Sequence, residues 1–315
     1  MLRAMWAVCW RAARSDVPPA QPPFTIMPSR RPLNSPVWSP DDILDAVAAA
    51  ISQREADLRA EHAVHGLDSL SEVKFHTLLA QGLRSTGHGV LREQPYPHEW
   101  RRKRRGGHHA ADLSDPNAPP SISDYSAIDT EAADPVTGEL PDPRDRMRCD
   151  LVLTPTAGQA VGDPLAQARA ARVRSTQAAG TLFAAVEAYD ALPPPPDNSC
   201  PPEDAFWLEV KLIGQFCYSA GVPGPNVSYT AELLRGPTAD ARKLSADGRI
   251  AYAASLVLLF TRDESTADHD LAQAVHRCLD RNLPIASPIR RSLAITDRIG
   301  NGVLTACMIP VRSSL

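Results

Sequence analysis

Three charged side chains stand inside two otherwise apolar segments. Glu209 and Lys211 lie in the segment 206–216, and Asp150 lies in the segment 147–154. Residues two apart in a strand point to the same face, so Glu209 and Lys211 are predicted to face the same way. Two buried carboxylates repel each other unless a cation lies between them, and Mg²⁺ prefers such oxygen ligands. If the two strands are adjacent, Asp150 and Glu209 form a metal site. Lys211 beside it would orient a water or neutralise phosphoryl charge.

Lysine is scarce in this chain, which gives Lys211 more weight. Of 33 basic residues only four are lysine, namely Lys74, Lys103, Lys211 and Lys243. Arginine and lysine differ chemically, because lysine is a compact donor whose pKa moves readily on burial. A lysine inside an apolar strand of an arginine-rich chain therefore indicates a chemical role.

The first half of the chain predicts two helices and two strands. Ser39-Pro40 is typical of a helix start, and an apolar stripe continues to about residue 60. A second helix is expected from about Leu70 to Arg84, followed by a strand from Val90 to Tyr96. Residues 147–154 alternate, which places Cys149, Leu151 and Leu153 on one face and Asp150 on the other.

The second half predicts the strand 206–216, a loop over 221–237 and a short helix over 240–248. Residues 252–260 are almost all apolar, so this strand should be covered on both faces. A helix over 269–281 is expected to bury Leu271, Val275 and Leu279. Segments 292–298 and 302–311 predict a closing hairpin around Ile299–Asn301.

These elements predict an α/β fold, with a mixed central sheet flanked by helices. Residues 15–38 are rich in Pro, Ser and Arg, and residues 1–38 are expected to be a disordered N-terminal segment, with Met27 as an alternative start. Residues 39–315 are expected to form one domain with long irregular insertions at about 98–145 and 156–203. The second insertion includes an Ala-rich helical piece at about 163–190.

Overall composition restricts the partners and the compartment. The formal net charge of −4 means that any attraction to nucleic acid must come from local patches. No apolar run reaches the roughly 18 residues that a membrane span requires. Six cysteines without a C-x-x-C pair are typical of reduced thiols, so a cytoplasmic protein is expected.

The motif residues resemble those of a known group of enzymes. Asp150, followed by Glu209-Val210-Lys211 after the apolar Phe206–Leu208, is similar to the motif of the PD-(D/E)xK (restriction-endonuclease-like) nuclease superfamily. The core of that family has the order helix, three strands, helix, strand, which matches the order expected for residues 70–261. The chain departs from the family in two ways: Arg148-Cys149 precede Asp150 where the motif has a proline, and the gap between Asp150 and Glu209 is unusually long.

The resemblance implies an enzyme, a Mg²⁺-dependent endonuclease that hydrolyses DNA phosphodiester bonds. Asp150, Glu209 and the Val210 carbonyl would hold the metal, with Mn²⁺ as an alternative ion, and Lys211 would position the attacking water. Glu72 occupies the place of a helix Glu that lies at the metal site in several branches. Many relatives are homodimers. The alternative function is a catalytically inactive nuclease-like fold that binds DNA or protein.

Several residues each allow two interpretations. Ser69-x-x-Glu72 fits a capping box, in which Glu72 only closes a helix start. Gln215 either extends the site or caps its strand. Asp240, Arg242, Lys243 and Asp247 lie on the helix after the motif strand. Arg242 or Lys243 either contacts substrate phosphate or belongs with the others to an ordinary solvated helix face, which is the favoured reading. His108-His109 is either a soft-metal ligand pair or ordinary loop. One basic run is a further candidate for DNA backbone contacts: Arg101, Arg102, Lys103, Arg104 and Arg105.

Overall fold

The computed structural model describes residues 38–97, 146–178 and 198–312, which lie within one compact unit. The expected disorder of residues 1–37, the whole first insertion at 98–145 and residues 179–197 of the second insertion fall outside the described residues. Trp38, which was placed in the disordered segment, instead belongs to the packed unit. Its ring is 8% exposed and contacts Phe206, and its indole N–H donates to the Asp204 carbonyl.

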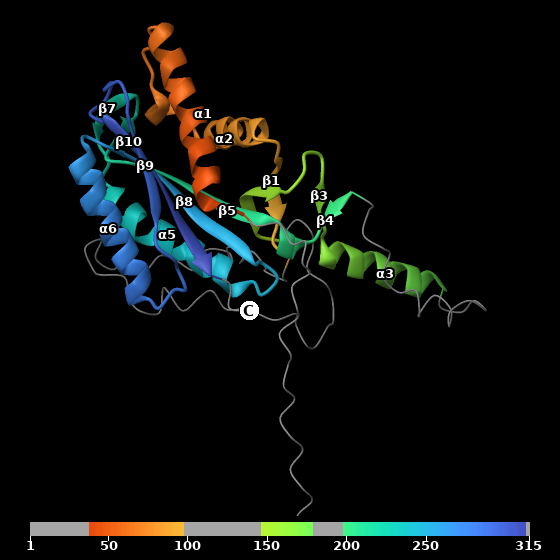
Figure 1. Ribbon diagram of the computed structural model, residues 1–315. Helices are drawn as coiled ribbons and strands as arrows, with labels where there is room; N and C mark the ends of the chain where they lie inside the picture. Colours follow the sequence, from red (N-terminus) through yellow and green to blue (C-terminus); the bar gives the residue numbers. More distant parts are fainter. Residues whose placement is uncertain (1–37, 98–145, 179–197, 313–315) are drawn as a thin grey trace, which may run out of the picture. The chain divides into compact units, whose positions relative to one another are not determined.

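A six-stranded mixed sheet forms the centre of this unit (Figure 1). Its order is β1 (Gly89–Pro95), β2 (Arg148–Thr154), β5 (Phe206–Gly214), β8 (Tyr252–Thr261), β10 (Val303–Arg312) and β9 (Ile289–Ala294). All neighbours are antiparallel except β5 and β8, which are parallel. A parallel pair needs a long crossover, and α5 (Tyr229–Ala246) supplies it. The predicted α/β class with a mixed sheet is confirmed.

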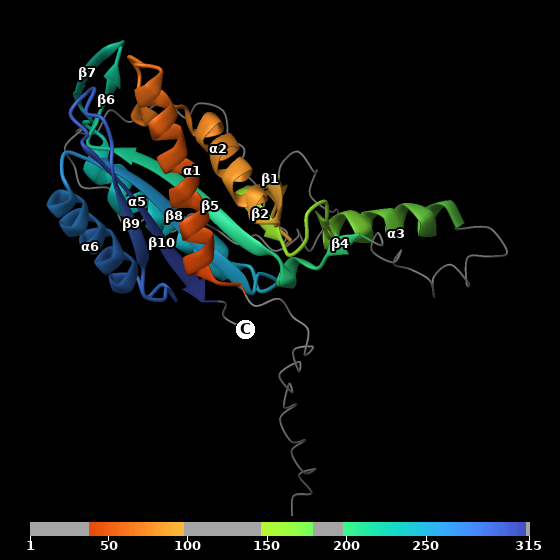
Figure 2. The same ribbon diagram turned by 45° about the horizontal axis from the view of Figure 1, so that its top comes forward.

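Helices cover both faces of the sheet (Figures 1 and 2). Helices α1 (Pro40–Ala60) and α2 (Glu72–Ser85) pack on one face, where Leu44 and Phe75 share a core cluster with Leu208 and Leu256. Helices α5 and α6 (Glu264–Asp280) pack on the other, where Leu233 and Leu271 join Val257. The apolar strand β8 is thus buried on both sides, as predicted.

The segment after β5 differs from the prediction. Residues 221–237 were expected to be a loop, with a helix only from 240. Instead β6 (Phe216–Ser219) and β7 (Val222–Pro225) form a hairpin, and α5 begins at Tyr229 and continues through Pro237. An internal proline removes one helical hydrogen bond and costs about 3 kcal/mol. Burial of Leu233, Pro237, Ala241 and Leu244 on one face of α5 offsets that cost.

Helix α6 also begins earlier than predicted, and its buried stripe has a different phase. Asp263 caps the helix by accepting a hydrogen bond from the Thr266 backbone N–H. The stripe that faces the sheet consists of Ala267, Leu271, Ala274 and Cys278. Leu279, which was expected to point inward, is 51% exposed because it follows Cys278 by one residue, or roughly 100° around the helix.

The described parts of the second insertion contain one helix, α3 (Pro164–Ala178), and three short elements. The short elements are β3 (Ala160–Val161), β4 (Ser199–Cys200) and the 3₁₀ turn η3 (Pro202–Asp204). Strands β3 and β4 pair with each other in parallel, so the two ends of the insertion are joined. None of the described helices is both long enough and apolar enough to cross a membrane.

The loop between β9 and β10 holds a neighbouring hairpin in place through Asn301. Its side chain is fully buried, accepts from the Phe216 N–H at 3.2 Å, and donates to the Phe216 carbonyl at 3.1 Å. The same amide donates to Asp68, which follows α1 in the turn η1 (Leu67–Ser69). One amide therefore links three segments that are distant in sequence.

Asn301→Ala is expected to lower the free energy of unfolding by about 2–4 kcal/mol, because it leaves several buried polar groups without partners. Urea denaturation followed by circular dichroism measures the change. Gln273→Ala, which removes an exposed side chain of α6, is the control and should stay within about 0.5 kcal/mol of the wild type. An equally small effect at Asn301 would contradict the structural role of its amide.

Candidate active site

Glu209 and Lys211 lie on the face of β5 that is covered by α5. Trp207 and Ile213 lie on the same face of the strand and pack in the apolar clusters on that side. Leu208 and Val210 lie on the opposite face and pack toward α1 and α2. Glu209 is 1% exposed, and about 30% of the Lys211 side chain is exposed. The period of two in the sequence therefore placed these side chains correctly on one face.

Helix α5 brings two further charged residues to this face. Lys243 lies between two carboxylates, with its Nζ 3.0 Å from Glu209 Oε1 and 3.0 Å from Asp240 Oδ1. The second oxygen of Asp240 is 3.7 Å from Lys211 Nζ. The favoured reading of Lys243 and Asp240 as part of a solvated helix face is wrong, because 17% and 1% of their side chains are exposed. A lysine held between two buried acids is not available as a surface ligand for DNA phosphate.

Tyr96 completes the shell around Glu209. Its hydroxyl donates to Glu209 Oε1, the same oxygen that contacts Lys243, and its ring stacks on Trp207. Burial alone would raise the pKa of Glu209, but Lys243, the Tyr96 hydrogen bond and Lys211 together lower it. Glu209 is therefore held as a carboxylate inside the protein.

Asp150 lies where β2 separates from β5. The ladder between these strands pairs Leu151–Leu153 with Phe206–Leu208. Beyond it, the Asp150 carboxylate accepts the Val210 backbone N–H at 2.8 Å in place of a strand partner. On its other side, Glu93 has a φ of 53° and interrupts the pairing with β1. Cys149 was predicted to share a face with Leu151. It packs with Val152 instead, because this irregularity interrupts the alternation of the strand.

The two acids of the motif meet at this separation of the strands. Burial raises the pKa of Asp150 to about 8, and the charge of the neighbouring Glu209 adds to the rise. Lys211 lies beside them and also donates to the Val210 carbonyl at 3.4 Å. Its pKa is raised: burial would lower it, but the charges of Asp240, Asp150 and Glu209 outweigh that effect. The result is a carboxyl pair that holds a proton unless a cation replaces it.

Glu72 approaches Asp150 from α2. The capping-box reading of Glu72 is wrong, because α2 begins at Glu72 with Ser71 as its N-cap, and Ser69 Oγ donates to the Gly66 carbonyl in η1. About half of the Glu72 side chain is exposed, so it is free to turn toward a ligand.

His76 is a site residue that sequence reasoning missed. One atom each of Glu72, His76 and Asp150 lies within 4.8 Å of the other two. His76 is 2% exposed, neither ring nitrogen has a hydrogen-bond partner, and burial lowers the pKa of the imidazole. The sequence carried a usable signal, since His76 follows Glu72 by four residues and so lies on the same helix face.

The remaining candidate residues either lie elsewhere in the structure or fall outside the described residues. Gln215 lies at the end of β5, where its side-chain oxygen accepts the Arg262 N–H and its carbonyl accepts the Asn226 N–H, as expected for a strand cap. Arg242 lies on α5 in a separate surface groove. The run Arg101, Arg102, Lys103, Arg104 and Arg105, together with His108 and His109, lies outside the described residues.

A surface depression next to α2 adjoins the site. Glu72 and Lys211 both line it, whereas Asp150 and Glu209 are not among its lining residues. Asp68, Asn226 and Glu232 line the same depression. Buried acids, a charged lysine and a surface depression lie together, an arrangement that fits the binding of a cation and of a ligand with a charged group.

Lys243→Ala is expected to destabilise the protein by about 3–5 kcal/mol, because two buried carboxylates lose their shared cation. Urea denaturation at neutral pH measures the loss. Lys74→Ala on α2 is the matched control, since Lys74 is exposed and its removal should change stability by less than about 0.5 kcal/mol. A loss below about 1 kcal/mol for Lys243→Ala would mean that the ion pairs contribute little to the fold.

Comparison with known proteins adds no relative: the chain matches no protein-family model, and no curated protein or solved structure is significantly similar to it.

Proposed function

We propose that this protein is a metal-dependent nuclease that hydrolyses DNA phosphodiester bonds. The observation that carries the proposal is the acid pair Asp150–Glu209, which meets beside Lys211 where β2 and β5 separate. The fold supports a restriction-endonuclease-like core, since α2, β1, β2, β5, α5 and β8 follow the order helix, three strands, helix, strand.

The residues present fit a divalent cation. Two neighbouring carboxyl groups and a buried imidazole without a hydrogen-bond partner are costly to keep unless a proton or a cation compensates them. Asp150, Glu209 and Glu72 offer the oxygen ligands that Mg²⁺ prefers, and His76 nitrogen is a ligand that Mn²⁺ also accepts. When bound, the cation would polarise the phosphate and lower the pKa of a water.

The chain's own residues have separate tasks in this proposal. Tyr96 and Lys243 keep Glu209 ionised and fix its orientation through the same oxygen, Oε1. Asp240 and the two motif acids keep Lys211 charged. The Lys211 ammonium, which lines the depression, orients the attacking water and neutralises charge on the phosphoryl oxygens.

A second function is favoured by the burial of Glu209. Its carboxylate is 1% exposed and already neutralised by Lys243, so the fold does not need a metal at that residue. A nuclease-like fold that binds DNA or protein without cutting would look the same here. The two functions differ in metal affinity, because only the nuclease requires the cation.

Asp150→Asn and Lys211→Ala are each expected to reduce DNA cleavage in Mg²⁺ by about 10²–10³-fold or more, since each removes a charge used in the transition state. Conversion of supercoiled plasmid to nicked and linear forms measures the rate. Asp57→Asn and Lys74→Ala, on the exposed sides of α1 and α2, are matched controls and should cut like the wild type. Equal activity of the wild type and both site variants would exclude the assignment.

Metal affinity is expected to rise from about pH 6 to about pH 8 and then to level off. Asp150 must lose its proton to bind a cation, and burial holds its pKa at about 8, so protons compete with the metal below that pH. Isothermal titration calorimetry with Mg²⁺ or Mn²⁺, repeated in buffers of different ionisation enthalpy, measures both the affinity and the proton release. Tight binding without proton release at pH 6 would show that Asp150 is not a ligand.

A further inference from the structure

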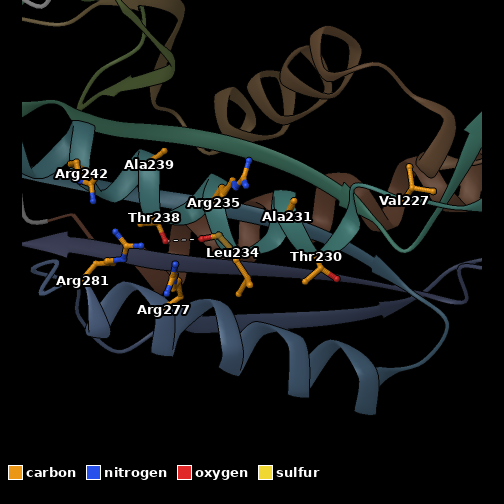
Figure 3. A pocket seen from close by; sticks show the side chains of 10 residues that line it. All are labelled: Val227, Thr230, Ala231, Leu234, Arg235, Thr238, Ala239, Arg242, Arg277 and Arg281. Carbon is orange, nitrogen blue, oxygen red and sulfur yellow. Dashed lines mark hydrogen bonds between the residues drawn. The ribbon is translucent and has the colours of Figure 1, made fainter. Parts of the chain in front are cut away.

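A groove between α5 and α6 is lined by four arginines (Figure 3). Arg235 and Arg242 come from α5, and Arg277 and Arg281 come from the C-terminal end of α6. The other lining residues are apolar or carry a hydroxyl: Val227, Thr230, Ala231, Leu234, Thr238 and Ala239. Figure 3 shows Arg277 and Arg281 reaching from α6 toward α5.

The regular spacing of the arginines follows from the two helices. Arg235 and Arg242 are seven residues apart, about two turns, so they lie along one side of α5. Arg277 and Arg281 are four residues apart and therefore neighbours on α6. Arg242 and Arg277 are partly buried, and Arg235 is exposed. The groove thus has a row of guanidinium groups on each side.

The charged residues that line this groove are all basic. No Asp or Glu is among them, although the chain as a whole has a formal net charge of −4. Guanidinium groups form strong charge-assisted hydrogen bonds with anions such as phosphate. The groove is therefore suited to a ligand with several negative charges.

The groove continues toward the proposed active site. A neighbouring depression shares Ala231, Arg235 and Ala239 with it and is also lined by Lys211. Lys211 in turn lines the depression that contains Glu72. A connected surface therefore runs from Glu72 through Lys211 and Arg235 to Arg242 and Arg277.

The length of this surface matches a nucleic-acid backbone. Arg235 and Arg242 are separated by roughly 10 Å along α5, from the helical rise of about 1.5 Å per residue. One strand of B-DNA carries a phosphate about every 3.4 Å of helix axis, so about three phosphates fit this distance. Several regularly spaced charges on one ligand fit the two rows of arginines better than a single small anion does.

We propose that the α5–α6 groove binds the sugar-phosphate backbone of the DNA next to the phosphate at Lys211. This inference rests on the proposed function, because it assigns the groove to that substrate. Arg242 and Arg277 contact phosphates from opposite sides of the groove, and Arg235 contacts the backbone between the groove and Lys211. Contacts of this kind position a duplex without reading its sequence.

The test measures DNA binding without cleavage. Fluorescence anisotropy follows a labelled 30-base-pair duplex in EDTA, with the wild type and the double variant Arg242→Ala/Arg277→Ala, over a series of salt concentrations. The control double variant, Arg54→Ala/Arg174→Ala, removes the same charge from α1 and α3, which contribute no residue to the groove. Two duplexes of unrelated sequence are compared, and anionic phosphatidylserine vesicles are used as a competitor.

The groove variant is expected to bind both duplexes more weakly by the same factor. The slope of log affinity against log salt should fall by about one for each arginine removed, while the control keeps the wild-type slope. Unchanged slope and affinity in the groove variant would overturn the inference even if the protein cuts DNA. Absence of DNA binding by the wild type would also overturn the inference. So would vesicle binding that requires Arg242 and Arg277, if DNA binding does not require them. Conversely, groove-dependent binding without cleavage in Mg²⁺ would retain the groove and reject the nuclease.

Discussion

The site depends on the ion pairs that the Lys243 ammonium makes with Glu209 and Asp240. Each buried carboxylate would cost several kcal/mol if it had no partner, and one cation compensates both. The contact also joins β5 to α5, the helix that connects the two parallel strands. Along both elements the charges separate two apolar clusters, one around Trp207 and Leu244 and the other around Ile213 and Leu233. The charged residues thus form a polar layer inside an otherwise apolar interface.

The separation of β2 from β5 determines how the interior acids meet. A continuous ladder would bury the backbone of Val210 against β2 and leave no space beside Glu209. Instead the Asp150 carboxylate takes the Val210 N–H, and the strands pair only over Leu151–Leu153. Asp150 is thereby held by the backbone while it faces Glu209 and, on the side of α2, Glu72 and His76. The separation of the strands brings the acids together, and the hydrogen bond from Val210 fixes the Asp150 carboxylate.

The acids of the candidate site and the arginines of the groove lie in different parts of the described structure, in a chain with a formal net charge of −4. Asp150 and Glu209 lie at the end of the β2–β5 ladder, where a cation would be needed before a phosphate approached. The arginines gather in the α5–α6 groove, which no acid lines. In the proposed function the acids hold the metal and the arginines hold the polyanion. Lys211 lies between these regions, since it lines both neighbouring depressions.

The sequence by itself determined the approximate places of the six strands of the central sheet, the shared face of the functional residues within a strand and the α/β class. Alternation over 206–213 gave the shared face of Glu209 and Lys211, and the apolar run 252–260 gave a strand buried on both faces, because both patterns are local.

Tertiary structure decided the rest. Pro237 was expected to end a loop, yet it lies inside α5, because burial of one helix face offsets the lost hydrogen bond. Lys243 and Asp240 were interpreted as a solvated face, and His76 was missed although its spacing from Glu72 placed both on one helix face. Their burial depends on which elements pack together, which no single segment encodes. The same reason applies to the arginine groove, whose two rows lie on helices joined through β8.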